Sequence, residues 1–231
     1  MSNIILSARS VRKTYGGGSG SFEALRGITL DIMDGESLAI IGKSGSGKST
    51  LMHLLALLDE PTDGTIFLDG RDTYDLRGKR LDRARNKMFG FVFQQFFLNP
   101  DQTVLENVTL PLKIAGLNAR ARRERAMATL EQLDLADKST NRATDLSGGQ
   151  KQRAVIARAL VGNPRIIFAD EPTGNLDSVT GRAVEDILID LNRAQGITLI
   201  IVTHDEELAA RCARRIHMRD GRLVETGAVA A

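Results

Sequence analysis

A glycine-rich run that ends in a lysine and two hydroxyl residues is the part of the sequence with the most evident chemistry. A short apolar run, residues 37–41, leads directly into it, and an apolar, helix-like stretch follows. In such a strand, loop and helix arrangement the backbone N–H groups turn inward around phosphate oxygens, and the helix N-terminus adds partial positive charge. Lys48 would reach the outer phosphates of a nucleotide, and Ser49 would ligate Mg²⁺. The predicted phosphate-binding residues are Gly42, Lys43, Ser44, Gly45, Ser46, Gly47, Lys48, Ser49 and Thr50.

Two acidic residues follow a second apolar run, residues 165–169. If this run is a buried strand of a parallel sheet, Asp170 at its C-terminal end would lie beside the glycine-rich loop and hold Mg²⁺ directly or through water. Glu171 would point elsewhere and orient or deprotonate an attacking water, an effect typically worth about 10²–10⁴ in rate. Taken alone, the same residues also fit a strand followed by an acidic turn without a catalytic role.

A third motif, Leu-Ser-Gly-Gly-Gln at residues 146–150, opens a helical pattern that continues through residue 160. A serine and glycines at the start of a helix offer backbone donors and a positive helix end, which together suit an anion. Because the glycine-rich loop already supplies one such site, the chain carries two. The plainer alternative is an ordinary N-cap at Ser147 with small neighbours for close packing.

These motifs, in this order, resemble those of the nucleotide-binding subunit of an ABC transporter, and the resemblance covers essentially the whole chain. The P-loop, signature, Walker B strand and D-loop of that family match, respectively, residues 42–50, 146–150, 167–171 and 174–177. The resemblance implies an ATPase that uses ATP and Mg²⁺. The catalytic residues that it implies are Glu171, Lys48, the switch histidine His204 and the Q-loop glutamine Gln94.

In that family two subunits pack head to tail, and each ATP lies between the P-loop of one subunit and the signature of the other. The resemblance therefore implies a homodimer in which the signature contacts the ATP held by the partner, with Asp177 in the D-loop. The signature residues concerned are Ser147, Gly148, Gly149 and Gln150.

The resemblance also assigns the adenine and metal contacts. Tyr15 matches the aromatic residue that stacks on adenine. The implied Mg²⁺ ligands are Ser49, Gln94 and Asp170. Gln95 adjoins Gln94, and the family spacing after residues 90–93 favours Gln94.

A narrower resemblance lies in residues 90–96, 105–108 and 170–178, which are similar to the subfamily that contains the macrolide-export and lipoprotein-release ATPases. It implies a separate transmembrane permease and either export or force transmission, with heme, an antimicrobial peptide, a drug or a lipoprotein as the cargo. Two alternatives stay open: an ATPase that regulates a membrane-anchored cell-wall or cell-division partner without transport, and a soluble ABC ATPase. Asn99 and Gln102 depart from the apolar residues usual where the permease docks, so the motifs do not identify the permease.

The predicted fold class is α/β: a RecA-like P-loop ATPase core with a mainly parallel sheet, an antiparallel β element and an inserted helical lobe. Strands are predicted at residues 4–9, 24–32, 37–41, 65–68, 89–93, 165–169 and 198–202, and helices at 103–115, 119–133 and 150–162. The runs at 37–41, 165–169 and 198–202 carry apolar residues at both odd and even positions, so both faces of each strand are apolar. This pattern is typical of the centre of a parallel sheet. An Asp-Gly pair at 220–221 predicts a C-terminal hairpin.

We therefore expect a single ABC ATPase domain over residues 1–231. Its P-loop core would comprise residues 1–94 and 163–231, and the helical lobe residues 95–162.

Composition excludes several other classes of protein. The chain has 231 residues, of which 42% are hydrophobic and 26% charged, and its formal net charge is +2. These values exclude a disordered chain, a collagen-like chain and a global polyelectrolyte, and no nucleic-acid partner is expected. The apolar runs are far shorter than the roughly 18 residues that cross a bilayer. The short apolar runs predict a cytoplasmic chain, and the resemblance implies that its permease holds it at the inner face of the membrane. The basic run at residues 120–125 is interpreted as a solvated helix face, with a membrane-surface or partner contact as the alternative.

Overall fold

Two β-sheets and the helices around them make up the computed structural model, which describes residues 3–228. The larger sheet has six strands in the order β10-β9-β3-β8-β7-β6. Its strands are parallel except for the C-terminal hairpin between β9 and β10. The bounds are β3 Ser37–Ile41, β6 Phe89–Phe93, β7 Ile166–Asp170, β8 Thr198–Thr203, β9 Arg214–Arg219 and β10 Arg222–Ala228.

The three strands predicted to lie at the centre of the sheet are neighbours in it. Strands β3, β8 and β7 lie side by side, and every residue of β3 and β8 is buried. Ala39 and Ile41 contribute to one hydrophobic cluster, whereas Leu38 and Ile40 contribute to another on the opposite face. Because successive side chains of a strand point to opposite faces, this alternation confirms that the sheet is covered on both sides.

The smaller sheet is antiparallel, in the order β2-β1-β4-β5. Its strands are β1 Ile4–Tyr15, β2 Phe22–Met33, β4 Asp63–Leu68 and β5 Arg71–Asp72. The predicted first strand stopped at residue 9, which was too short. The register shifts between Ala8 and Val11, and Ser10 has a positive φ of 49°, so a bulge interrupts the period-two pattern on which the prediction depended.

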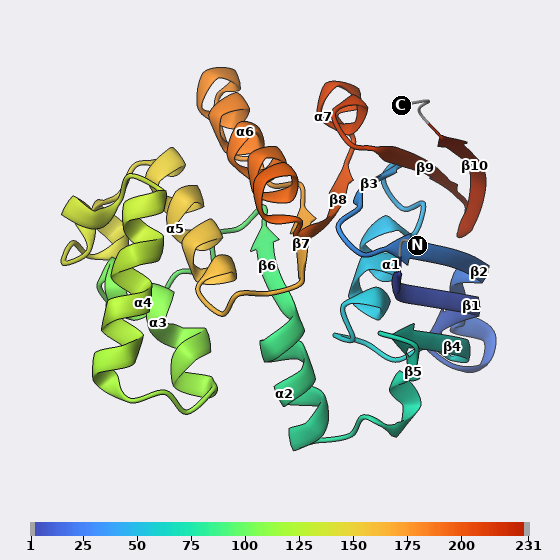
Figure 1. Cartoon of the computed structure of the whole chain (residues 1–231). Coiled ribbons are helices and arrows are strands. Elements are labelled where there is room, and N and C mark those ends of the chain that lie inside the picture. Colours follow the sequence, from blue (N-terminus) through green and yellow to red (C-terminus); the bar gives the residue numbers. More distant parts are fainter. Residues whose placement is uncertain (1–2, 229–231) are drawn as a thin grey trace.

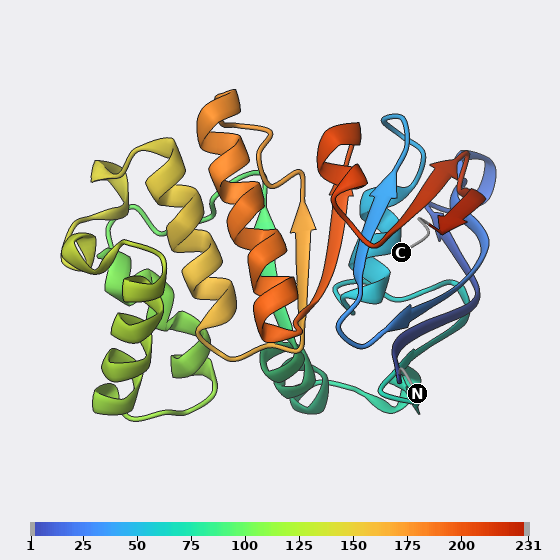
Figure 2. The ribbon, with the colours of Figure 1, turned by 45° about the horizontal axis from the view of Figure 1, so that its top comes forward.

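Helices cover the two faces of the large sheet. Against the face that carries Leu38 and Ile40 pack the antiparallel sheet and α1, Lys48–Leu55. Against the other face pack α5 Gly148–Leu160, α6 Ser178–Gln195 and α7 Glu206–Ala210, while α3 Val104–Ile114 and α4 Ala119–Gln132 pack on α5 and extend the same hydrophobic cluster. Figures 1 and 2 both show α3, α4 and α5 grouped at one side of the molecule, with α1 and the antiparallel sheet at the other.

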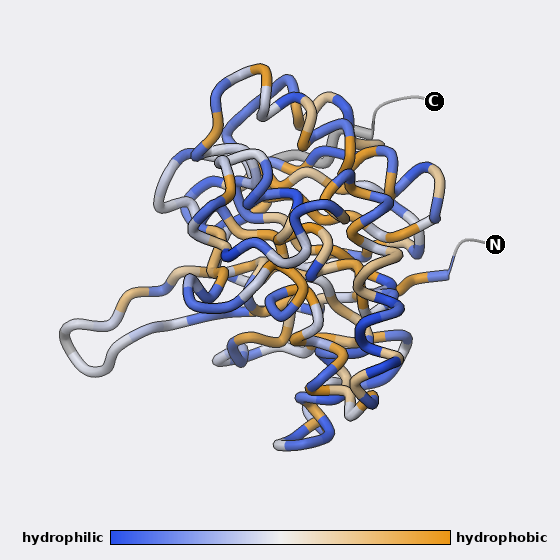
Figure 3. Tube along the Cα trace, turned by 90° about the vertical axis from the view of Figure 1, so that its left-hand side faces the viewer, coloured by the Kyte–Doolittle hydropathy of each residue, from blue (hydrophilic) through white to orange (hydrophobic). Residues whose placement is uncertain are grey.

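The three predicted helices of the inserted segment are present, each within two residues of its predicted limits. Helix α5 begins two residues earlier than predicted because Ser147 and Gln150 form a reciprocal N-terminal capping box. The basic run lies on α4, where Arg120 pairs with Glu124 in solvent, as expected of a solvated face. The tube in Figure 3 shows hydrophobic and hydrophilic residues alternating along the outer segments, as elements with one buried face require.

Helix α2, Lys79–Met88, was not predicted. It buries none of its ten residues and is dominated by Lys and Arg, so no apolar stripe with helical spacing marks it in the sequence. Among the described residues no helix combines the length and the apolar character that crossing a membrane requires. Short 3-10 turns lie at Gly18–Gly20, Thr73–Asp75, Ala136–Lys138 and Ala143–Asp145.

Candidate nucleotide site

The P-loop connects β3 to α1 and forms one wall of a cavity of about 610 Å³. Gly47, the N-cap of α1, has a φ of +100°, and a Cβ there would lie 2.8 Å from the Ala24 carbonyl oxygen. Only glycine tolerates both conditions, so the loop can turn its backbone amides inward at this point. The cavity is lined by Phe22, Ala24, Gly42, Lys43, Ser44, Gly45, Gly47, Lys48, Ser49, Thr50, Gln94, Asp170, Glu171, Val202 and His204.

Lys48 lies within the rim of the cavity and is 9% exposed. Its ammonium donates hydrogen bonds to the carbonyl oxygens of Gly42 at 2.7 Å and Lys43 at 3.1 Å. These two bonds hold the positive charge over the loop, where phosphate oxygens can replace the carbonyls as acceptors.

Ser46 is the exception among the predicted phosphate-binding residues. It is buried, does not line the cavity, and its amide donates to the Lys43 carbonyl at 3.2 Å. The structure therefore uses this amide to close the turn of the loop. The spacing of the motif alone gave no sign of the difference.

Asp170 ends β7 and lines the same cavity as Ser49 and Gln94. Burial raises the pKa of Asp170 above its ordinary value, because a carboxylate is poorly solvated there. A carboxylate, a hydroxyl and an amide oxygen are the hard donors that suit Mg²⁺. Within residues 3–228 no three His, Cys, Asp or Glu side chains converge on one point. This donor set fits a Mg²⁺ that takes its other ligands from phosphates and water.

Glu171 forms a tight turn immediately after β7. Its φ is +44°, its amide donates to the Val202 carbonyl at 2.9 Å, and its own carbonyl accepts from the Gly174 amide at 3.1 Å. A left-handed non-glycine residue costs of order 1–3 kcal/mol and is typical of functional sites. Here the turn directs the carboxylate into the cavity beside Asp170.

His204 faces Glu171 across the cavity mouth. The Nδ1 atom of His204 lies 2.9 Å from Glu171 Oε1, and the Thr203 hydroxyl donates to Glu171 Oε2 at 3.4 Å. The hydrogen bond and the negative charge of Glu171 raise the pKa of His204 above its ordinary value. A carboxylate and an imidazole in this contact can accept a proton from water and orient it.

Gln94 follows β6 and lines the cavity, whereas Gln95 does not. The Asn175 side-chain amide donates to the Gln94 carbonyl at 2.8 Å, which ties this position to the loop after Glu171. A Cβ at Gly174 would lie 2.8 Å from Gln94 Nε2, so the glycine leaves room for the glutamine side chain.

The signature residues do not line this cavity. Ser147 is the N-cap of α5: its hydroxyl accepts from the Gln150 amide at 3.3 Å, and the Gln150 side chain accepts from the Ser147 amide at 2.9 Å. Gly148 and Gly149 form the first turn of α5. Figures 1 and 2 show α5 beyond α6 as seen from α1, so the chain keeps the two predicted phosphate sites apart.

Asp177 also lies outside the cavity. Its carboxylate caps α6 by accepting from the amides of Val179 at 3.1 Å and Thr180 at 3.0 Å. These backbone bonds lower the pKa of Asp177, so the group is charged at neutral pH.

Tyr15 lies at the end of β1 and is 40% exposed, near the cavity but not among its lining residues. Its partner in the β1–β2 register is Phe22, which does line the cavity, as does Ala24. Neither Phe22 nor Ala24 was predicted as a site residue. The available signal was an aromatic residue two positions after the glycine-rich turn, on a strand paired with the one that ends at Tyr15.

Comparison with known proteins places this geometry in a family. The family described as ABC transporter matches residues 25–174. The chain is 47% identical to the lipoprotein-releasing system ATP-binding protein LolD of Syntrophus aciditrophicus, over 95% of this chain and 99% of that protein. It is 48% identical to the macrolide export ATP-binding/permease protein MacB of Brucella melitensis, over 95% of this chain but 34% of that longer protein.

A solved structure agrees in fold. The dimeric structure of a post-hydrolysis state of the ATP-binding cassette MJ0796, bound to ADP and Pi, superimposes with a TM-score of 0.89 at 40% identity, over 98% of this chain and 99% of that one. Sequence and fold therefore agree over nearly the full length. The chain belongs to the ATP-binding subunits of the ABC transporter family and is an ABC-type ATPase.

Proposed function

We propose that this chain hydrolyses ATP as a head-to-tail homodimer and thereby drives a separate membrane permease. The observation that carries the proposal is the division of the site: one cavity holds the P-loop with Glu171 and His204, while the signature at the start of α5 lies outside that cavity. A second copy, turned end for end, would bring its signature to the ATP held by the first. The related MJ0796 cassette has been solved as a dimer with ADP and Pi.

In this proposal each binding residue has one task. Lys48 and the amides of the P-loop bind the phosphates, and Tyr15 stacks on adenine, an interaction worth roughly 1–3 kcal/mol. Ser49, Gln94 and Asp170 hold Mg²⁺, which neutralises charge on the phosphates when bound. Ser147, Gly148, Gly149 and Gln150 contact the partner's ATP, and Asp177 lies at the dimer interface.

Glu171 and His204 carry the hydrolytic step. Glu171 accepts the proton of the attacking water, and His204 orients that carboxylate through the 2.9 Å contact between them. Since phosphoryl transfer requires little covalent chemistry from the protein, positioning by these residues supplies most of the rate. The chain acts as one domain, residues 1–231, with a core of residues 1–94 and 163–231 and a helical lobe of residues 95–162.

A second cavity, of about 500 Å³, supplies the docking place for the permease. It lies between α2, β6, α3 and α5, and its apolar lining includes Leu110 and Ile114, which are 45% and 64% exposed. Exposed apolar side chains around a groove are typical of protein interaction sites. A short helix of the permease fits this groove, and the subunit is thereby held in the cytoplasm at the inner face of the membrane.

The relatives favour export as the work that is driven. LolD is named for lipoprotein release and MacB for macrolide export, and each is nearly half identical to this chain. We infer that the permease moves, or transmits force to, a substrate of that general kind: a lipoprotein, a drug, a peptide or heme.

Affinity capture tests the permease assignment. The tagged chain, expressed with the membrane proteins of its host and extracted in mild detergent, is expected to retain a protein with transmembrane helices. Ile114→Asp should lose that protein, because it places a charge in the groove. Val224→Asp is the matched control, since Val224 is a 53% exposed apolar residue on β10, outside the groove.

Equal capture by both variants would contradict docking at this groove. Capture of no membrane protein by the unaltered chain would contradict the permease itself.

A further inference from the structure

The loop after α1 is fastened to the strand that carries Tyr15. This loop, residues 56–62, connects α1 with β4. The Thr62 amide donates to the Arg12 carbonyl at 2.9 Å, and the Thr14 amide donates to the Thr62 hydroxyl at 3.0 Å. The end of β1 and a loop more than forty residues further along the chain therefore form one unit.

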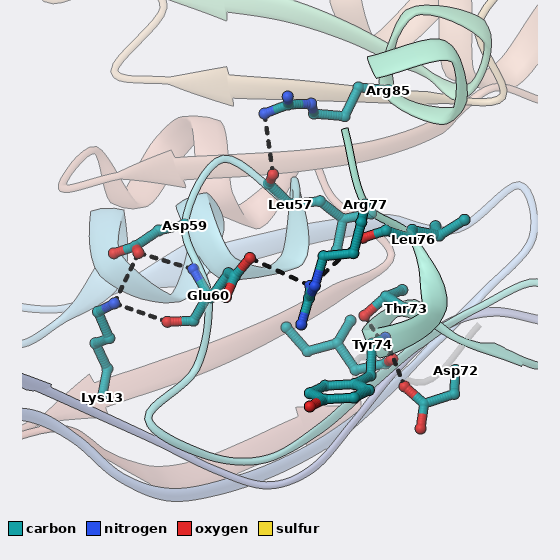
Figure 4. Close-up of polar contacts among 11 residues, drawn as sticks. Lys13, Leu57, Asp59, Glu60, Asp72, Thr73, Tyr74, Leu76, Arg77 and Arg85 are labelled. Carbon is teal, nitrogen blue, oxygen red and sulfur yellow. Dashed lines mark hydrogen bonds and ion pairs between the residues drawn. The ribbon is translucent and has the colours of Figure 1, made fainter. Parts of the chain in front are cut away.

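Asp59 lies at the centre of this contact. Its Oδ2 atom accepts a hydrogen bond from the Tyr15 hydroxyl at 2.9 Å, and its Oδ1 atom accepts one from the Lys13 ammonium at 2.7 Å. The Glu60 amide donates to the same Oδ1 at 2.7 Å. Figure 4 shows Lys13, Asp59 and Glu60 converging at this point. Both carboxylate oxygens are thus engaged, and one of their partners is the phenol of Tyr15.

The protonation states suit this arrangement. Burial opposes charge on Asp59, but the hydrogen bonds from Lys13, the Glu60 amide and Tyr15 outweigh it and hold the pKa of Asp59 below its ordinary value. Burial and the bond to Asp59 raise the pKa of Tyr15. At neutral pH a neutral phenol therefore donates to a charged carboxylate, and such charge-assisted bonds are among the strong ones.

Lys13 also acts on the ring itself. Its Nζ atom lies over the Tyr15 ring, 4.9 Å from the centroid, and donates to the Glu60 carbonyl at 2.7 Å. The Lys13 side chain is 12% exposed, so the ammonium is held in place. A cation over one face of the ring leaves the opposite face for another flat group.

We propose that Asp59, supported by Lys13, is a positioning residue that fixes the Tyr15 ring as the platform for the nucleobase. This inference rests on the proposed stacking of Tyr15 on adenine. Tyr15 ends β1, is followed by the glycine-rich turn at residues 16–20, and is 40% exposed, so packing alone leaves its ring free to turn. The hydrogen bond to Asp59 removes that freedom before the base arrives, which lowers the entropic cost of stacking.

The test separates binding of the base from binding of the phosphates. In the full-length chain, Asp59→Ala and Tyr15→Phe should each raise KM and Kd for ATP about 3- to 10-fold, the cost of ordering one side chain, with kcat unchanged. Binding of tripolyphosphate, which has the phosphates without the base, should stay at the wild-type value. The double variant should be no worse than either single variant, because both remove the same bond.

Two further variants serve as controls. Asp59→Asn keeps an acceptor for the phenol and should recover most of the ATP affinity lost in Asp59→Ala. Glu60→Gln changes the neighbouring carboxylate, which pairs with Arg77 at 3.2 Å, and should bind ATP as the wild type does.

Each contrary result has its own meaning. Equal loss of ATP and tripolyphosphate binding in Asp59→Ala would overturn the proposal, since it would show damage to the P-loop. Normal ATP binding by Asp59→Ala, beside a loss of roughly tenfold or more in Tyr15→Ala, would overturn the role of Asp59 and leave the stacking role of Tyr15 standing. Normal ATP binding by Tyr15→Ala would overturn both.

Discussion

The P-loop follows a strand whose two faces are both buried, whereas the signature at residues 146–150 follows an exposed turn and opens a helix at the molecular surface. Lys48 is 9% exposed and lies in a cavity with Asp170 and Glu171. Ser147 is exposed, and within residues 3–228 its hydrogen bonds are to Gln150 and Lys151 of its own helix. The first region is a pocket formed within one chain. The second region is an exposed helix N-terminus that is accessible to a second copy of the chain.

Helix α3 provides a comparison for the signature at the start of α5. Its N-cap Thr103 forms the same kind of capping box, with Glu106, as Ser147 forms with Gln150. The capping box of α3 provides hydrogen-bond acceptors for the backbone amides at the start of that helix, and it has no proposed role in catalysis. Any difference between the two boxes in their effect on hydrolysis therefore measures what the signature does beyond capping its helix.

Removal of the Glu171 carboxylate should lower the rate of ATP hydrolysis more than the N-cap substitutions below. Glu171→Gln should hydrolyse ATP about 10²–10⁴-fold more slowly, because water loses its proton acceptor. ATP binding should persist, since the P-loop donors are unchanged, and dimers should accumulate with ATP in size-exclusion chromatography. Hydrolysis at the wild-type rate would show that Glu171 is not the base.

Loss of the two N-caps compares the helices directly. Ser147→Ala and Thr103→Ala should each lower the free energy of unfolding by about 0.5–2 kcal/mol, measured by chemical denaturation. Only Ser147→Ala should also lower the ATPase rate, about tenfold or more, because a hydrogen bond to the partner's phosphate is lost. Equal ATPase rates in the two variants would show that Ser147 caps its helix and has no further role in hydrolysis.

The smallest predicted effect is on the pKa of His204, which contacts Glu171 in the cavity. The NMR titration of His204 should give a pKa above its ordinary value, and Glu171→Gln should bring it back towards that value. Because the folded pKa is raised, the stabilisation from this pair is present below about pH 6.5 and is lost as the pH rises through the folded pKa. The imidazole is 77% exposed, so this stabilisation is small. An unchanged titration in Glu171→Gln would contradict the pairing.

Contiguous motifs allowed the P-loop and the β7 acids to be predicted from sequence, because each combines a buried run with a turn that has few alternatives. The apolar spacing predicted helix α5, but the helix begins two residues earlier because of its capping box. The bulge at Ser10 and the charged helix α2 were not predictable in this way, since neither keeps a regular apolar period. The contact of Asp59 with Tyr15 joins positions 44 residues apart, and no local pattern marks it. Phe22 reaches the cavity only through its register with Tyr15, which depends on the hairpin between them.

Subunit mixing tests the divided site most directly. Lys48→Ala disables the P-loop and Ser147→Arg disables the signature, so each variant alone should be inactive. In a head-to-tail dimer of one with the other, one of the two sites combines an intact P-loop with an intact signature. An equal mixture of differently tagged variants, in which half of the dimers are mixed, should therefore recover about a quarter of the wild-type ATPase rate. If mixed dimers form but hydrolyse no more ATP than the separate variants, the result would contradict an ATP site shared between the P-loop of one subunit and the signature of the other.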